Sequence, residues 1–226
     1  MGDYIDSATL IFETLKSEIL TLEIKPGEPV IEAEVCKRFS ASRTPVRTAF
    51  HRLSDAGLLE TIRYKGSRAP LINHEIVKQL IFMRISVEEK VLLEYVDIFD
   101  QFSIADAYNA LKKQELSLEI GDFSIQQFYE DDACFHKIWF DRCEKDYLWS
   151  VLQDLSIDYT RFKTLDIVTK EPCAEILKEH RALLEAIEAK NKEEIKKIIK
   201  KHLNGGIRRL STMMETKYSS YFIQKM

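Results

Sequence analysis

The chain has 226 residues, of which 45% are hydrophobic and 31% charged, and its formal net charge is −4. This length allows one large or two small domains with a hydrophobic core, and the composition is that of an ordinary soluble globular protein. Because the net charge is slightly negative, the overall charge of the chain gives no sign of a nucleic-acid partner. No apolar run approaches the roughly 18 residues that a membrane-spanning helix needs.

The cysteines indicate the compartment. Four are present, at Cys36, Cys134, Cys143 and Cys173. They show no paired spacing, and no signal peptide is recognisable before them. This pattern favours free thiols in a reducing environment. The sequence therefore predicts a cytoplasmic protein.

In chain order, two helices are expected first. Asp6 and Ser7 can cap a helix that ends before the turn Lys25-Pro26-Gly27. A short second helix follows from about Glu32 to Phe39.

A third helix is predicted from Thr44-Pro45, where the threonine hydroxyl would cap it and the proline fits the first turn. Apolar residues recur on one face of this helix at helical spacing: Val46, Ala49, Phe50 and Leu53. Arg43, Arg47 and His51 form a row on another face, and Gly57 ends the helix. A short helix with an apolar back and an arginine-bearing front is what the major groove of DNA accepts.

A hairpin is expected next. Residues 58–62 and 67–70 flank Tyr64-Lys65-Gly66, which places a glycine at the tip. Three helices followed by a hairpin make a winged helix-turn-helix, and we assign it to residues 1–72.

The first domain also carries a local concentration of positive charge. Between residues 37 and 68 the basic side chains are Lys37, Arg38, Arg43, Arg47, Arg52, Arg63, Lys65 and Arg68. Only Asp55 and Glu60 oppose them. A basic island in an acidic chain is typical of a localised phosphate contact, although a solvated charged face has the same composition.

The second half, residues 73–226, is expected to be an all-helical bundle. Helical periodicity extends over segments near 75–99, 103–120, 124–142, 146–165, 173–189 and 192–221. Gly205-Gly206 interrupts the last segment and could kink it. The fold class is therefore mainly α, with an N-terminal winged helix-turn-helix and a C-terminal helical bundle.

Four residues of the bundle form a candidate metal site. Asp132 and His136 are four residues apart and share one helix face. His180 and His202 lie on the apolar stripes of two further helices. Any one of these histidines is more often a core residue than a ligand. Because buried carboxylates and imidazoles are costly unless paired or metallated, their conjunction predicts one divalent cation.

Two arginines are candidates for binding an acidic effector. Arg84 lies on an apolar face, so its guanidinium is directed at the bundle interior, where it suits a carboxylate. The alternative is an internal salt bridge to Glu88 or another acid. Arg161 is a second candidate by the same reasoning.

Residues 19–68 resemble the N-terminal domain of GntR-type transcription regulators. The resemblance rests on Ser42-Arg43-Thr44-Pro45-Val46-Arg47, Gly57-Leu58-Leu59 and Gly66. Cys36, Ser40 and Thr48 depart from the residues that are usual there, which are alanine, glycine and glutamate. The resemblance implies a set of DNA-contacting residues. We assign to it Ser42, Arg43, Thr44, Arg47, Lys65, Gly66 and Arg68.

Residues from 73 to about 210 resemble the FCD effector domain of the FadR-like branch. The anchors are Arg84 with Glu88, the Asp132-to-His136 segment, His180 and His202-Leu203. In metal-containing members an aspartate and three histidines bind the ion, and all four positions are filled here. The resemblance implies one divalent ion per chain, with zinc, nickel and manganese left open. Members that bind an acyl-CoA lack this set.

These features together predict a homodimeric regulator, not an enzyme, that binds a palindromic double-stranded operator and senses a small carboxylate. Repression released by the ligand is the common mode in the resembling family.

One rival interpretation is a metal-dependent enzyme with an accessory DNA-binding domain. Asp131, the only nearby acid, projects about 100° away from Asp132 around the helix, which disfavours it as a catalytic base. The other rival is a purely structural metal.

Overall fold

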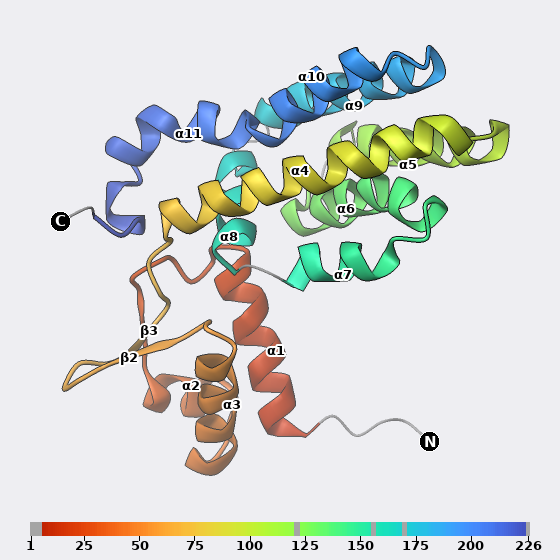
Figure 1. Cartoon of the computed structure of the whole chain (residues 1–226). Coiled ribbons are helices and arrows are strands. Elements are labelled where there is room, and N and C mark those ends of the chain that lie inside the picture. Colours follow the sequence, from red (N-terminus) through yellow and green to blue (C-terminus); the bar gives the residue numbers. More distant parts are fainter. Residues whose placement is uncertain (1–5, 120–122, 155–156, 169–170, 225–226) are drawn as a thin grey trace. The chain divides into compact units, whose positions relative to one another are not determined.

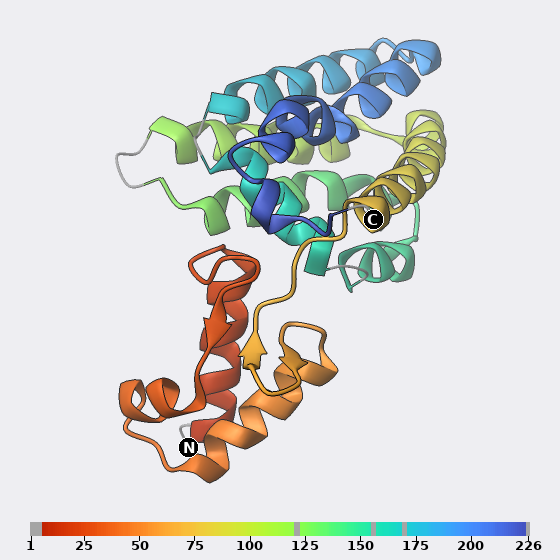
Figure 2. The same ribbon diagram turned by 90° about the vertical axis from the view of Figure 1, so that its left-hand side faces the viewer.

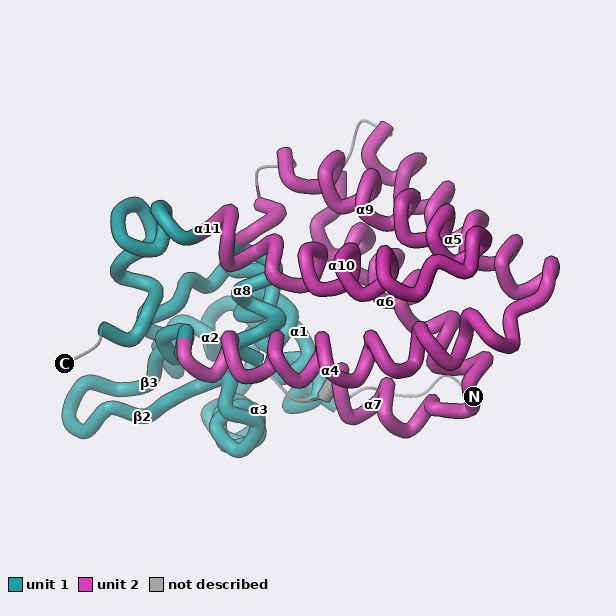
Figure 3. Tube along the Cα trace, turned by 45° about the horizontal axis from the view of Figure 1, so that its top comes forward, with its two compact units in different colours: residues 1–74, 157–165, 211–226 teal, residues 75–156, 166–210 magenta. Residues whose placement is uncertain are grey.

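The computed structural model describes residues 6–119, 123–154, 157–168 and 171–224. The chain divides into two compact units (Figure 3). Unit 1 contains residues 1–74, 157–165 and 211–226, and unit 2 contains residues 75–156 and 166–210. The boundary predicted after residue 72 lies near the end of the first segment of unit 1. Sequence patterns did not predict the two later segments of this unit, and the domain limits 1–72 and 73–226 stay a prediction.

Unit 1 begins with the three expected helices. They are α1 (Ser7–Leu20), α2 (Glu32–Arg38) and α3 (Arg43–Asp55). Asp6 caps α1 by accepting a hydrogen bond of 2.9 Å from the backbone N–H of Thr9. The cap of α3 differs from the prediction, because the helix begins two residues earlier and Ser42 takes the N-cap position. Thr44 therefore lies in the first turn and was wrongly assigned as the cap.

A small antiparallel sheet completes the winged fold. Its strands are β1 (Pro29–Val30), β2 (Glu60–Ile62) and β3 (Gly66–Arg68), in the order β1-β3-β2. Gly66 has a φ of +88°, which explains the glycine at the start of β3. The predicted hairpin is confirmed. Strand β1 was missed because two residues cannot show an alternating pattern.

The core of unit 1 fixes which side of α3 faces outward. Helix α1 packs against α3 (Figures 1 and 2). The buried side chains of this core include Ile11, Leu15, Ile19, Val46, Ala49, Phe50, Leu53 and Leu58. The apolar face predicted for α3 is therefore buried, and Arg43, Arg47 and His51 remain exposed.

Two segments distant in sequence complete unit 1. Helix α8 (Ile157–Ile167) donates a hydrogen bond of 3.0 Å from the Thr164 hydroxyl to the carbonyl of Leu20. The C-terminal segment pairs with residue 72, since the N–H of Ile72 donates to Tyr221 at 2.8 Å and the N–H of Ile223 donates to Ile72 at 3.0 Å.

The described residues of unit 2 form helices joined by short loops and turns. Its helices are α4 (His74–Ile98), α5 (Gln101–Glu119), α6 (Ile125–Arg142), α7 (Asp146–Asp154), α9 (Glu171–Glu188), α10 (Lys192–Leu203) and the start of α11 (Gly205–Glu215). Helix α5 packs against α6 and α9, and α9 packs against α10. None of the helices among the described residues is both long and apolar enough to cross a membrane. The mainly α fold class is confirmed.

Two predicted helices differ in extent. The segment 146–165 corresponds to α7 and α8, and residues 155 and 156 lie outside the described residues, as does residue 120 at the predicted end of α5. The segment 192–221 is divided at Asn204 into α10 and α11, and a short 3-10 helix follows at Ser219–Tyr221. At Gly205 a Cβ would lie 2.7 Å from the guanidinium of Arg209. The glycine thus leaves room for this arginine, which binds Asp166 at 2.9 Å.

We expect Phe222→Ala to destabilise unit 1. The ring is only 5% exposed and packs edge-on against His74 and Phe162. Removal of a buried aromatic ring costs about 3–5 kcal/mol. Urea denaturation followed by circular dichroism would measure the loss. Ile223→Ala is the control, because that side chain is 53% exposed, and equal losses for the two variants would contradict the packing role of Phe222.

Candidate metal centre and nucleic-acid interface

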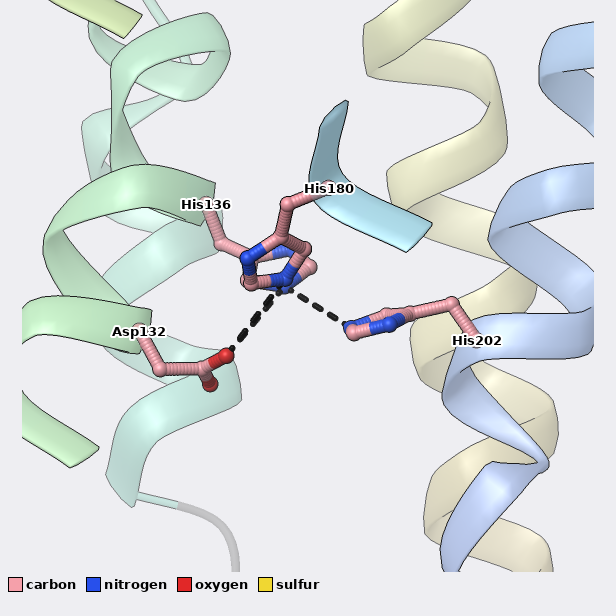
Figure 4. A group of neighbouring side chains, drawn as sticks. All are labelled: Asp132, His136, His180 and His202. Atoms are coloured by element: carbon pink, nitrogen blue, oxygen red, sulfur yellow. Dashed lines mark hydrogen bonds and ion pairs between the residues drawn. The ribbon is translucent and has the colours of Figure 1, made fainter. Parts of the chain in front are cut away.

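The four candidate metal ligands converge in unit 2. Asp132 and His136 come from α6, His180 from α9 and His202 from α10, and their side chains point toward one another (Figure 4). One ligand atom from each residue lies within 4.8 Å of all the others. Three neighbouring helices therefore bring together residues that are up to 70 positions apart in sequence.

The separations fit a single ion. The Nε2 atoms of His136 and His202 are 3.2 Å apart. The Oδ1 atom of Asp132 lies 3.6 Å from His180 Nε2 and 3.9 Å from His136 Nε2. Nitrogen and oxygen ligands lie about 2.0–2.2 Å from zinc, so adjacent ligand atoms on one ion are about 3.0–3.5 Å apart. Small shifts of these side chains would complete such a shell.

Each histidine is oriented by an oxygen acceptor on its other nitrogen. His136 Nδ1 donates to Glu88 Oε2 at 2.7 Å, and His202 Nδ1 donates to Glu179 Oε2 at 3.1 Å. His180 Nδ1 donates to the Gln114 side-chain oxygen at 2.9 Å. These bonds place the proton on Nδ1 and leave Nε2 as the lone-pair nitrogen, which is the arrangement found in histidines that bind metals.

The facing nitrogens themselves suit a cation. When His136 and His202 both carry their protons on Nδ1, two lone pairs confront each other across 3.2 Å. A single shared proton could relieve this pair, but the Asp132 carboxylate and His180 also face the same point (Figure 4). A divalent cation satisfies all four groups at once, so the residues present fit the metal.

The partner of His136 is itself held by an arginine. Arg84 donates from Nε to Glu88 Oε1 at 2.7 Å, and its Nη2 lies 2.6 Å from the same oxygen. Burial alone raises the pKa of Glu88, but the charge of Arg84 and the hydrogen bonds from Arg84 and His136 outweigh it and lower that pKa to about 2. Burial lowers the pKa of His136 although Glu88 opposes the shift, which favours the neutral, ligating imidazole.

The remaining carboxylate partner is also paired. Glu179 is 5% exposed and lies 3.2 Å from the ammonium of Lys201. Burial raises the pKa of Glu179, but His202 and Lys201 together lower it below its usual value. Sequence reasoning missed Glu179 and Gln114, because nothing in one sequence shows which inward-facing residues of different helices meet.

The other predicted residues of the helical half lie elsewhere. Arg161 belongs to unit 1, where it is 1% exposed and donates hydrogen bonds to the carbonyl of Pro70 and to Asp158. It therefore belongs to a different unit from the four candidate metal ligands. Asp131 is bound by Lys113 at 2.8 Å and by the hydroxyl of Ser117 at 2.8 Å. It is therefore not positioned as a base beside the candidate metal.

The predicted DNA-contacting residues gather at the N-terminal part of α3 and on the β2–β3 hairpin. The exposed ones are Ser42, Arg43, Thr44, Arg47, Lys65 and Gly66, whereas Arg68 is partly buried. Arg47 pairs with Glu32, and Arg68 pairs with Glu60. Within the described part of the chain no ion pair engages Arg43 or Lys65. All of these groups except the partly buried Arg68 are open to a polyanion.

Two family profiles match the chain. The profile "Bacterial regulatory proteins, gntR family" matches residues 8–68, and the FCD domain profile matches residues 79–205. Among curated proteins, the HTH-type transcriptional repressor RspR of Escherichia coli is 26% identical over 195 residues, which cover 85% of this chain and 84% of RspR. The HTH-type transcriptional regulator YdhC of Bacillus subtilis is 27% identical over 205 residues, or 90% of this chain and 91% of YdhC.

Solved structures show the same fold. McbR/YncC of E. coli has a TM-score of 0.67 at 19% identity, and the match covers 92% of this chain and 99% of that one. A putative transcriptional regulator GntR from Rhodococcus sp. RHA1 has a TM-score of 0.70 at 17% identity, with 90% and 97% covered. The two domain profiles, together with this fold, establish that the chain belongs to the GntR family of DNA-binding transcription regulators and carries an FCD effector domain.

Proposed function

We propose that this regulator is a homodimeric repressor in the cytoplasm whose FCD domain senses a small carboxylic acid at a metal ion. Asp132, His136, His180 and His202 would hold one divalent ion, and zinc, nickel and manganese all suit such ligands. The observation that carries the proposal is the convergence of these four groups within 4.8 Å. The name of the E. coli relative RspR, a repressor, supports the direction of regulation.

The charges around the site support an anionic effector. Glu88 is neutralised by Arg84, and Glu179 is paired with Lys201. Asp132 is then the one carboxylate among the four candidate ligands, because the other three are histidines. A divalent cation beside one such carboxylate retains a positive charge in a buried site, where an uncompensated charge is costly. A carboxylate that binds the metal directly would remove that charge.

The geometry changes the role that we propose for the two candidate arginines. Glu88 engages the Nε and Nη2 groups of Arg84, so we propose that Arg84 acts on the site through Glu88 and His136. Arg161 belongs to unit 1, where its two terminal nitrogens are engaged by Pro70 and Asp158. The acid would thus be bound chiefly by the ion rather than by an arginine.

Two DNA-reading units in a two-fold dimer would recognise a palindromic operator, because the symmetry of the site mirrors that of the protein. The acid would change operator affinity by the difference in its affinity for the DNA-bound and released conformations. The family and the relatives are transcription regulators, which points away from an enzyme.

The first prediction concerns metal content. Protein purified without chelator should contain about one divalent ion per chain by elemental analysis, and a chelator should lower its melting temperature because the ion binds only the folded state. Asp132→Asn should reduce the metal content strongly. The matched control is Asp131→Asn, the same change at the neighbouring carboxylate. Wild-type protein that stays metal-free after incubation with zinc, nickel or manganese would refute the site.

The second prediction concerns the residues behind the ligands. Glu88→Gln should weaken metal affinity about 10- to 100-fold, because the variant lacks the carboxylate charge that orients and polarises His136. Competition with a chromophoric chelator would measure the affinity, and circular dichroism would confirm the fold. Glu89→Gln removes a neighbouring charge as a control. Equal affinities in the two variants would show that Glu88 does not act on the metal.

The third prediction concerns the effector. In a thermal-shift screen of small carboxylic acids, an effector at about 100 times its Kd should stabilise the metal-loaded protein by about 2.7 kcal/mol, or roughly 5–10 °C. The same acid should weaken binding of the operator duplex in a gel shift. Asp132→Asn should remove both responses. A shift of equal size in metal-free protein would separate effector binding from the metal.

A further inference from the structure

One arginine of α3, the helix predicted to contact DNA bases, is bound by a carboxylate of the same unit. Arg47, on α3, donates from Nε to the Oε2 atom of Glu32 at 3.3 Å. Glu32 is the first residue of α2, and α2 packs against α3. The two helices of the helix-turn-helix therefore place an acid beside an arginine that is predicted to read DNA.

The hairpin repeats this arrangement. Arg68 on β3 donates from Nε to Glu60 Oε1 at 2.6 Å, and the two residues are directly opposed in the β2–β3 register. In both pairs the carboxylate binds Nε. An arginine has one N–H on Nε and two on each terminal nitrogen. The Nη1 and Nη2 groups of Arg47 and Arg68 have no hydrogen-bond partner within the described part of the chain.

An arginine held at Nε has a defined plane and direction. Its two Nη groups then form the edge that can donate two parallel hydrogen bonds to guanine O6 and N7. The edge of Arg47 has space in front of it, because Arg47 and Glu32 line a groove of about 240 Å³ together with His51, Thr61 and Ser67. This groove lies between α3 and the strands of the hairpin, within unit 1.

We propose that Glu32 is a positioning residue for sequence reading, which holds the Arg47 guanidinium so that its Nη edge meets a base in one orientation. The side chains of Arg47 and Glu32 are 62% and 43% exposed, so solvent alone would leave the arginine mobile. Arg43, one turn earlier on the same row, has no such partner among the described residues. Sequence discrimination is therefore expected to depend on Arg47 more than on Arg43.

The proposal predicts two effects of opposite sign. A carboxylate near DNA repels every duplex, so removal of its charge should strengthen binding to all sequences. Loss of an orienting contact should instead weaken binding to the preferred sequence alone. A residue that acts only through its charge would change the affinities for the preferred sequence and for other sequences by the same factor. A positioning residue would instead change the ratio of these two affinities.

The experiment uses the full-length protein and a duplex that the wild type selects from a random-sequence pool, with a scrambled duplex of the same composition. Fluorescence anisotropy at one fixed salt concentration gives both affinities for the wild type, Glu32→Gln and Glu34→Gln. Glu34 is the matched control, since it is exposed on the same helix and forms no ion pair among the described residues. We expect Glu32→Gln to lower the ratio of selected to scrambled affinity about tenfold, and Glu34→Gln to leave it unchanged.

A double-mutant cycle tests the pathway through Arg47. Arg47→Lys keeps the charge but lacks Nε, so it should lose discrimination by itself, and adding Glu32→Gln should cause no further loss. The proposal is overturned if Glu32→Gln leaves the ratio as in the wild type, or if its effect is the same in the Arg47→Lys background. The inference rests on DNA binding by α3. A wild-type protein that selects no duplex would remove that function itself, which is a different result from an unchanged ratio.

Discussion

The structure of unit 2 depends on how a helical core accommodates ionised groups. Glu88 is completely buried, and a lone carboxylate there would be too costly to retain. Arg84 and His136 compensate it from two sides, and this pairing keeps the carboxylate ionised. The same contact fixes the imidazole with Nε2 directed at His202 and Asp132. The hydrogen bond between Glu88 and His136 therefore compensates a buried charge and also orients a candidate metal ligand.

Both candidate sites use the same principle. In unit 2, Glu88 and Glu179 bind the nitrogens of His136 and His202 that do not face the candidate metal site. In unit 1, Glu32 binds the Nε of Arg47 and leaves the outward edge open. In each case an acid fixes the direction of a side chain and leaves its functional atoms to an external partner. The difference lies in solvent exposure, because the pairs in unit 2 are buried whereas the side chains of Arg47 and Glu32 are 62% and 43% exposed.

The sequence predicted those features that are encoded within one element. The apolar face of α3 and the shared face of Asp132 and His136 follow from helical spacing, and the structure shows both. Inward-facing histidines on three helices also suggested a common site. What could not be predicted depends on pairing between elements. The carboxylate behind His202 comes from Glu179, which is adjacent in sequence to a different ligand, His180. The same limit applies to Arg161, whose apolar setting suggested the bundle interior although it completes unit 1.

The arrangement of ligands also constrains how an effector could act. An ion that binds both conformations of the domain equally would stabilise the fold without shifting any equilibrium. Because all four ligands lie on α6, α9 and α10, the ion is suited to tying these three helices together. An acid that entered the coordination shell of such an ion would then change the charge at their junction. Such an acid could alter DNA binding only through the difference between its binding free energies for two arrangements of these helices. An acid that bound the ion equally tightly in both arrangements would be a ligand without being an effector.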